Sequence, residues 1–159
     1  MYNHEPKGYH CPFCLLASGV ENKNVLTKQD DIVYQDRLVT AFIASHWWPK
    51  NAGHVIIIPN KHFENIYDLP DNLSARIHKI ERMVAIAFKA VYHCDGVSSR
   101  QHNESAGNQD VWHYHLHVFP RYKNDQLYEH HAQKQVANPE ERKRYSKKIR
   151  TYFQKHPVK

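Results

Sequence analysis

Short runs of β-branched and aromatic residues mark the first half of the chain as strand-forming. Residues 31–35 (DIVYQ) and 37–44 (RLVTAFIA) predict two strands, and the polar pair Gln35-Asp36 predicts a hairpin turn between them. Residues 54–59 (HVIIIP) predict a third strand, which is apolar on both faces and ends at its proline. Strands joined by such short links favour an antiparallel sheet.

One long segment has helical periodicity. Over residues 70–93, apolar side chains recur at steps of three and four, which places them on one face of a helix: Leu73, Ile77, Ile80, Val84, Ala87 and Val91. Asp68 is the expected N-cap, with Pro70 and Asp71 in the first turn. Gly96 is the expected C-terminal stop. We expect this helix to cover one face of the sheet.

The second half of the chain supplies the remaining elements. Residues 97–102 and 113–120 predict two further strands, separated by a loop at 104–110. Residues 139–153 predict a surface helix rich in lysine and arginine. The whole pattern predicts an α+β fold, in which an antiparallel sheet of about five strands is packed by one long helix and followed by a C-terminal basic helix.

Length and composition fit one globular domain. The chain has 159 residues, 41% of them hydrophobic and 24% charged. We expect a single domain over 1–159, with a core at about 11–122, an N-terminal segment at 1–16 and a C-terminal helical tail at 135–159. The sequence has no apolar run long enough for a transmembrane helix, and residues 1–10 lack the apolar region of a secretory signal. A cytoplasmic protein without membrane contact is therefore expected.

Three histidines at alternating positions are the main candidate for chemistry. In a strand, side chains at i, i+2 and i+4 share one face, so His113, His115 and His117 should line up while Tyr114 and Leu116 enter the core. Three imidazoles on one face suggest phosphate chemistry. Spacing alone leaves two alternatives open: three solvent-facing histidines without partners, or a site where all three bind zinc.

A second candidate site is the pair Cys11 and Cys14, in a Cys-x-x-Cys arrangement. In a reducing compartment this spacing is typical of a structural zinc site or a redox pair. A thioredoxin-type pair requires a strand before the motif, and residues 4–10 do not resemble one. Two unbound thiols are the other alternative. Cys94, at the end of the long helix, is expected to be an ordinary thiol.

The segment His113-Tyr-His115-Leu-His117-Val-Phe119 resembles the signature of the histidine triad (HIT) family. The upstream loop at 103–110 resembles the loop that precedes this signature. Residues 54–62, preceded by Gly53, resemble the family's second signature, a Gly-His followed by a strand, a proline and often another histidine. The matches cover most of residues 11–122. The resemblance implies an α+β fold, a homodimer that joins two five-stranded sheets, and hydrolysis of nucleoside phosphoramidates, dinucleoside polyphosphates or adenylated amines.

The resemblance also implies roles for individual residues. His115 is the nucleophile, and His117 lies near the phosphate oxygens and the leaving group. Asn103 contacts the phosphate or leaving group, and Gln109 belongs to the phosphate loop. A neutral imidazole can attack phosphorus at pH 7, and the resulting nucleotidyl-imidazole is open to hydrolysis. A second, protonated histidine can stabilise the negative charge or protonate the leaving amine. No metal is needed for this step.

One branch of the family binds zinc through two cysteines and two histidines. The positions that match here are Cys11, Cys14, His62 and His113, so the resemblance implies a structural zinc that ties the N-terminus to the sheet. This ligand set would take His113 out of the chemistry.

The expected partners are a small-molecule nucleotide and a second copy of the chain, with an apolar seam that includes part of the helix at 70–93. The basic run at 142–150 is expected to be a solvated helix face rather than a nucleic-acid surface, although the formal net charge is +6.

Ala44 matches a position where many relatives carry a ribose-binding carboxylate or amide, which predicts weaker ribose recognition. The alternative functions are a nucleotide-binding regulatory protein with little turnover, and a zinc-dependent phosphoesterase.

Overall fold

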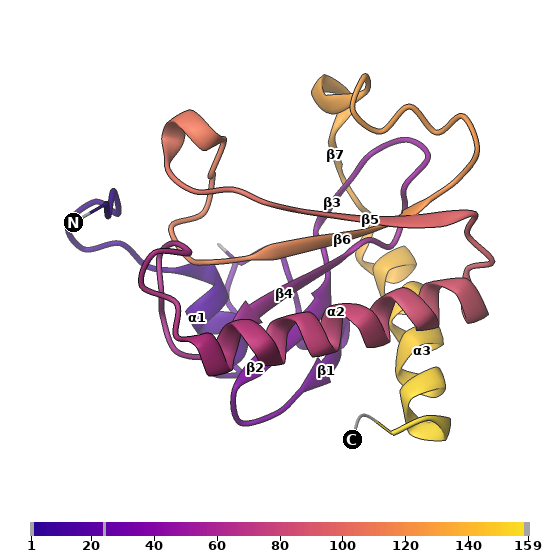
Figure 1. The fold of residues 1–159 in the computed structure, drawn as a ribbon, viewed down its shortest axis with the longest axis horizontal. Coiled ribbons are helices and arrows are strands. Elements are labelled where there is room, and N and C mark those ends of the chain that lie inside the picture. Colours follow the sequence, from indigo (N-terminus) through magenta and orange to yellow (C-terminus); the bar gives the residue numbers. More distant parts are fainter. Residues whose placement is uncertain (1, 24, 158–159) are drawn as a thin grey trace.

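A five-stranded antiparallel sheet forms the centre of the computed structural model, which describes residues 2–23 and 25–157 (Figure 1). The strand order is β1-β2-β4-β6-β5. The bounds are Ile32–Gln35 for β1, Val39–Ile43 for β2, Val55–Pro59 for β4, Leu116–Arg121 for β6 and Gly96–Gln101 for β5. The α+β class and the five strands predicted from the sequence are confirmed.

Helix α2 (Asp71–Val91) covers one face of the sheet. Its buried residues repeat at helical spacing: Leu73, Ile77, Ile80, Val84, Ala87 and Phe88. The helix agrees with the expected range 70–93 to within two residues, but the expected N-cap and C-terminal stop were wrong. Pro70 occupies the N-cap position without a side-chain hydrogen bond, so Asp68 does not cap the helix. At the other end Tyr92 is the C-cap and His93 has a φ of 55°, so the chain turns before it reaches Gly96, which starts β5.

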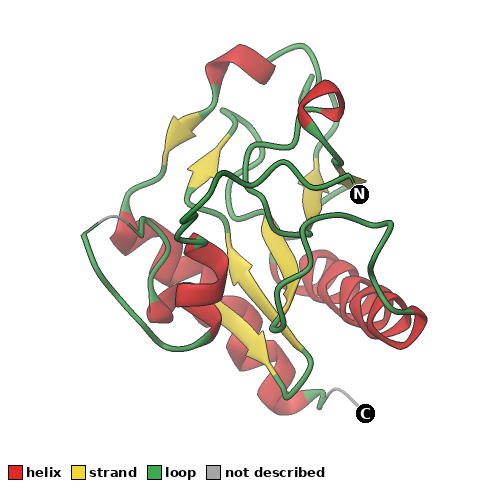
Figure 2. Ribbon diagram, turned by 90° about the vertical axis from the view of Figure 1, so that its left-hand side faces the viewer, coloured by secondary structure: helices red, strands yellow, loops and turns green. Residues whose placement is uncertain are grey.

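The opposite face of the sheet is covered by α1 (Pro12–Ala17). Phe13 and Leu16 of this short helix pack with Phe42, Ile56 and Ile58 in a second apolar cluster. Figure 2 shows the strands between helices on both sides. Short 3₁₀ turns occupy Gln29–Asp31, Ser105–Gly107 and His131–Gln133.

The C-terminal part of the chain is tied to the sheet by a buried ion pair. Helix α3 (Pro139–Lys155) begins after Asn138, whose side chain accepts a hydrogen bond from Glu140 N. Arg142, expected on a solvated face, is 1% exposed and its Nε lies 3.1 Å from both carboxylate oxygens of Asp31. The positive charge is buried because a carboxylate and backbone carbonyls satisfy the guanidinium.

A second, two-stranded sheet stands apart from the first. Strand β3 (His46–Trp47) pairs with β7 (Gln135–Val136), near the top of Figure 1. The C-terminal tail therefore returns to the end of β2 before α3 begins. Within the described ranges, no helix is both long and apolar enough to cross a membrane.

The strand expected at 113–120 begins later than predicted. Leu116 and Val118 lie in the core, as the alternation predicts, but His113 and His115 precede β6. The reason is local: His113 N donates a hydrogen bond to Val111 O, and Tyr114 N donates to Phe63 O, so the backbone here is bonded to loops instead of a strand partner. Only His117 of the three histidines is held by the sheet.

Candidate functional site

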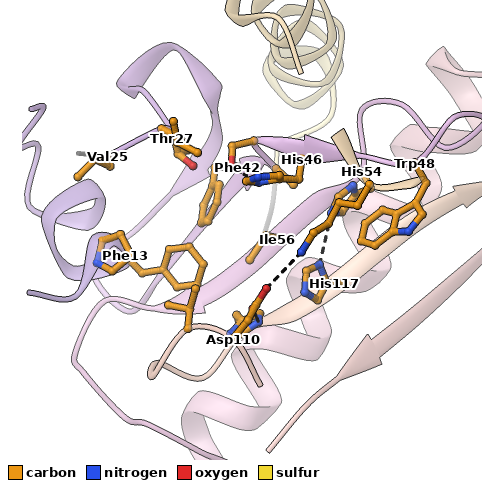
Figure 3. A pocket seen from close by; sticks show the side chains of 17 residues that line it. Phe13, Val25, Thr27, Phe42, His46, Trp48, His54, Ile56, Asp110 and His117 are labelled. Carbon is orange, nitrogen blue, oxygen red and sulfur yellow. Dashed lines mark hydrogen bonds and ion pairs between the residues drawn. The ribbon is translucent and has the colours of Figure 1, made fainter. Parts of the chain in front are cut away.

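A cavity of about 230 Å³ opens beside the histidines, on the side of the sheet away from α2 (Figure 3). One part of its wall is apolar and includes Pro12, Phe13, Val25, Phe42 and Ile56. The other part carries groups that can bind charge or protons: His46, His54, Asp110, His115, His117 and Lys134. Such a cavity suits a ligand with an apolar ring at one end and an anion at the other.

His115 presents one ring nitrogen to this cavity in a fixed tautomer. Its Nδ1 lies 2.7 Å from the backbone oxygen of His113, so Nδ1 carries the proton and Nε2 keeps its lone pair. The ring is 2% exposed and meets the ring of Phe13 edge-on at 5.4 Å. Burial lowers the pKa of His115, which favours the neutral imidazole at pH 7. A neutral imidazole that is buried and held in one orientation can act as a nucleophile.

His117 and His54 form a pair of neutral imidazoles beside it. His117 Nδ1 lies 3.3 Å from His54 Nε2, and the His117 ring stacks on Phe119. Burial lowers the pKa of His117 well below its usual value and that of His54 to about 3. Burial and neighbouring positive charge therefore disfavour the protonated form of these two histidines in the free protein.

Positive charge reaches the site from Arg100 instead. Arg100 lies opposite His117 in the β5–β6 ladder, and its guanidinium carbon is 4.8 Å from the ring centres of both Trp48 and Phe119. Its charge contributes to the lowered pKa values of His54 and His117. Sequence reasoning missed Arg100, since a single arginine in a polar edge strand gives no signal of its own.

Asn103 and Gln109 lie in the loop before the triad and do not line the cavity. Asn103 Oδ1 accepts a hydrogen bond from Ile66 N at 2.8 Å. Gln109 is buried; its Nε2 donates to Glu64 O and Val111 O, and its Oε1 accepts from Glu104 N. These contacts fix the path of the loop that carries Asp110 to the cavity. Asp110 and Lys134 were also missed: neither has a recognisable spacing to the histidines.

Ala44 lies in the cavity wall at the end of β2, 2% exposed. The next two residues also line the cavity, and Ser45 Oγ lies 3.1 Å from His46 Nδ1. Polar groups are therefore available one and two positions beyond the alanine.

A compact group of Cys11, Cys14, His62 and His113 lies behind the triad. The four donor atoms are within 4.8 Å of one another. Cys11 Sγ is 3.3 Å and Cys14 Sγ 3.4 Å from His113 Nδ1, and Cys14 Sγ is 3.3 Å from His62 Nδ1. A tetrahedral centre with bonds of about 2.0–2.3 Å separates its donors by roughly this much. These four residues can hold a metal ion.

The surroundings of this group also fit a metal. His113 Nε2 donates a hydrogen bond to Pro59 O at 2.9 Å, which leaves Nδ1 as the electron-pair donor. His62 Nε2 lies 3.2 Å from the carboxylate of Glu5. The hydrogen bond between the two thiols lowers the pKa of Cys11 and raises that of Cys14, because the pair shares a proton that a cation would displace. In the described part of the chain, His115 and His117 belong to no such group.

The fold and the site together define a class of protein: an α+β sheet that presents a buried histidine, fixed by the backbone of another histidine, to a cavity beside it. The chain belongs to the HIT family, because the HIT domain matches residues 26–124. An uncharacterized HIT-like protein of Borreliella burgdorferi is 31% identical over 119 residues, which cover 74% of this chain and 79% of that protein.

Solved structures agree with this assignment. A HIT-like protein from Bartonella henselae, described as involved in cell-cycle regulation, has a TM-score of 0.75 at 26% identity and covers 94% of this chain and 98% of its own. A zinc-bound histidine triad protein from Mycobacterium smegmatis has a TM-score of 0.73 at 24% identity, with 92% and 94% covered.

Two similar proteins have named activities. The diadenosine triphosphate hydrolase of Plasmodium falciparum shares the fold, with a TM-score of 0.68 at 16% identity, and covers 98% of this chain and 90% of its own. The adenylylsulfatase HINT3 of Arabidopsis thaliana is 24% identical over 118 residues, which cover 74% of this chain and 55% of that protein. Hydrolases that act on nucleotides are thus among the family members that this chain is similar to.

Proposed function

We propose that the protein is a hydrolase or nucleotidyl transferase that cleaves a phosphoramidate or phosphoanhydride bond of a nucleotide through a covalent intermediate on His115. The observation that carries the proposal is the 2.7 Å hydrogen bond from His115 Nδ1 to His113 O, which leaves Nε2 unprotonated at the cavity wall. The named activities of the Plasmodium and Arabidopsis proteins support a nucleotide as substrate class.

The reaction proceeds in two displacements. His115 Nε2 attacks phosphorus, a bond from nitrogen to phosphorus forms, and the bond from phosphorus to the leaving nitrogen or oxygen breaks. A leaving amine keeps the electron pair and takes up one proton from solvent. Water then attacks the nucleotidyl-histidine, loses a proton and restores the neutral imidazole. One water is consumed, and the nucleoside monophosphate and the free leaving group are released.

Other groups in and around the cavity receive roles in this scheme. Arg100 and the His54–His117 pair stabilise the phosphoryl oxygens, the first by charge and the second by hydrogen bonding. The apolar wall around Phe13 and Phe42 holds the base. Asn103 and Gln109, assigned to the phosphate by resemblance, act by holding the loop of Asp110, since their amide groups are engaged in internal hydrogen bonds.

We infer that the metal of the Cys11, Cys14, His62 and His113 group is zinc in a structural role. Two sulfur and two nitrogen donors are typical of such sites, and the zinc-bound mycobacterial protein has the same fold. A bound zinc would supply folding energy and fix the thiolates and imidazoles around itself. His113 would then be unable to join the chemistry except through its backbone oxygen.

We also propose a homodimer. Among the described residues, strand β5 lies at an edge of the sheet and has a strand partner on one side only, and Ile86 on α2 is 43% exposed. A second copy of the chain placed against β5 and α2 would cover the open strand edge and Ile86, in agreement with the apolar seam expected along α2.

Mass spectrometry of the protein mixed with an adenosine phosphoramidate tests the central proposal. The expected result is a transient mass increase of one adenylyl group on the peptide that contains His115. Tight binding of adenosine monophosphate without any adduct or turnover would support a regulatory nucleotide-binding protein instead. Adduct formation that stops on chelation, while the protein remains folded, would support a catalytic metal.

A further inference from the structure

A carboxylate stands next to the nucleophile, where an anionic substrate must bind. Asp110 Oδ1 lies 3.9 Å from His115 Nε2, and Asp110 Oδ2 lies 3.4 Å from Lys134 Nζ. Both Asp110 and Lys134 line the cavity, and Figure 3 shows the Asp110 side chain pointing into it. A site built only to hold a phosphate would gain nothing from a negative charge at this point.

Two separate parts of the fold bring this ion pair to the cavity. Asp110 follows Gln109, whose three internal hydrogen bonds fix the loop. Lys134 comes directly before β7, which is held by its pairing with β3, and its ammonium group lies 6.0 Å from the ring centre of Trp48. The two partners of the pair are 24 positions apart in the sequence.

The pair is exposed enough to open. The side chains of Asp110 and Lys134 are 64% and 36% exposed, so water screens their attraction and a substrate can compete for either partner. A reacting phosphorus must come within about 3–3.5 Å of His115 Nε2, which brings the phosphoryl oxygens next to this pair. Lys134 is then attracted to the phosphate, and Asp110 is left for whatever the leaving group carries.

We propose that Asp110 is a specificity-determining residue that selects nucleoside phosphoramidates with a cationic leaving amine over those with a neutral or anionic leaving group, including polyphosphates. This inference rests on the proposed function and narrows its substrate class. The carboxylate attracts a second ammonium group on the leaving amine and repels a carboxylate or phosphate there. Lys134 binds the phosphate common to all these substrates.

The chemical step is unchanged by this selection. The bond between phosphorus and nitrogen breaks, the bond between phosphorus and His115 Nε2 forms, and the amine leaves with its electron pair and one proton from solvent. The distal ammonium group keeps its charge throughout. Asp110 therefore acts by electrostatic attraction and forms no bond to the reacting atoms.

Three adenosine 5′-phosphoramidates of equal chain length isolate the charge: those of 1,4-diaminobutane, pentylamine and 5-aminopentanoate. Wild-type kcat/KM should fall in that order, by about 3- to 10-fold per step, as expected for one charge near a partly screened carboxylate. In Asp110→Asn the three values should approach one another. Comparing variants on the same substrates cancels differences in intrinsic reactivity. Asp68→Asn, an exposed acid outside the cavity wall, should keep the wild-type order.

The variant Lys134→Met distinguishes the role of Lys134 from that of Asp110. It should lower kcat/KM for all three substrates and keep the order, or make it steeper, because Asp110 loses its counter-charge. The inference is overturned if Asp110→Asn keeps the wild-type order, if it lowers all three values equally, or if the wild type prefers the anionic substrate. In those cases an adduct on His115 would leave the proposed function standing. Absence of both adduct and turnover with all three substrates would refute the two together.

Discussion

His113 contacts the nucleophile and the cysteines at the same time: its backbone oxygen accepts the hydrogen bond from His115 Nδ1, and its ring Nδ1 faces Cys11 Sγ at 3.3 Å. A metal that held the His113 ring would therefore also fix the carbonyl group that sets the tautomer of His115. The candidate metal ligands and the nucleophile are thus connected through a single residue, His113.

Replacement of His115 should abolish turnover and leave binding. His115→Asn removes the attacking nitrogen, so hydrolysis of an adenosine phosphoramidate should fall by more than about 10³-fold. Titration calorimetry with adenosine monophosphate should still show binding. His78→Asn, on the exposed side of α2 and away from the cavity, is the matched control and should keep wild-type turnover. Wild-type rates in His115→Asn would refute the nucleophile.

Metal analysis tests the ligand set. The purified protein should contain one zinc per chain, and Cys14→Ser should lose it together with part of its thermal stability, since structural zinc is coupled to folding. Cys94→Ser removes a thiol outside the group and should keep the full zinc content. A full complement of zinc in Cys14→Ser would rule out this set of ligands.

A substitution on α2 tests the proposed homodimer. Light scattering at micromolar concentration should give the mass of two chains for the wild type. Ile86→Glu places a charge on an exposed apolar position of the proposed seam and should give a monomer. Lys79→Glu, a charge reversal on the same helix, should remain dimeric. A wild-type monomer would contradict the proposal directly.

Ribose recognition should improve when a carboxylate is placed at the end of β2. Ala44→Asp should tighten binding of adenosine monophosphate by about 2- to 12-fold, the effect of one hydrogen bond to a hydroxyl. A ribose-free phosphoramidate should bind unchanged. If the wild type already discriminates strongly against both deoxy analogues, the contact is made elsewhere, and Ser45→Ala, beside Ala44 in the cavity wall, should then weaken binding.

Acid should destabilise the protein through Asp125. The Arg121 guanidinium holds the pKa of this buried carboxyl below its usual value of 3.8, with help from Asn51 and two backbone N–H groups. A lowered folded-state pKa means that the stabilisation is complete well above pH 4 and is lost as the pH falls below that value. Denaturant unfolding should show this loss in the wild type. Asp125→Asn should be less stable by about 1–3 kcal/mol at pH 7 and should show a smaller dependence on pH below 4.

The parts of the fold that local patterns dictate were predictable. Periodicity located α2 and all five strands of the main sheet, and the alternation around Leu116 placed the core side of β6 correctly. The residues that cap the helix were not predictable. Pro70 precedes α2 and His93 follows it, and the backbone conformation at these positions, not a side-chain cap, sets the two ends. The small sheet was missed as well, since β3 and β7 are two residues long and pair across most of the chain.

The candidate site likewise combines residues that the sequence indicated with residues that it did not. The Cys11, Cys14, His62 and His113 group was expected from the resemblance to the HIT family, and the structure brings these four side chains together. Arg100, Asp110 and Lys134 were not foreseen. Strand register brings Arg100 to the histidines, the loop held by Gln109 brings Asp110, and the return of the C-terminal tail brings Lys134. Long-range placement of single charges leaves no periodic trace in a sequence.

The pairing of β3 with β7 has a consequence for how such a protein can change over generations. The HIT domain match ends at residue 124, and Lys134 lies beyond it. The nucleophile His115 and the His113 carbonyl that orients it lie within the matched residues, whereas Lys134 in the cavity wall comes from the segment beyond them. Substitutions in that segment can therefore change the charge at the cavity wall without altering the residues that orient His115.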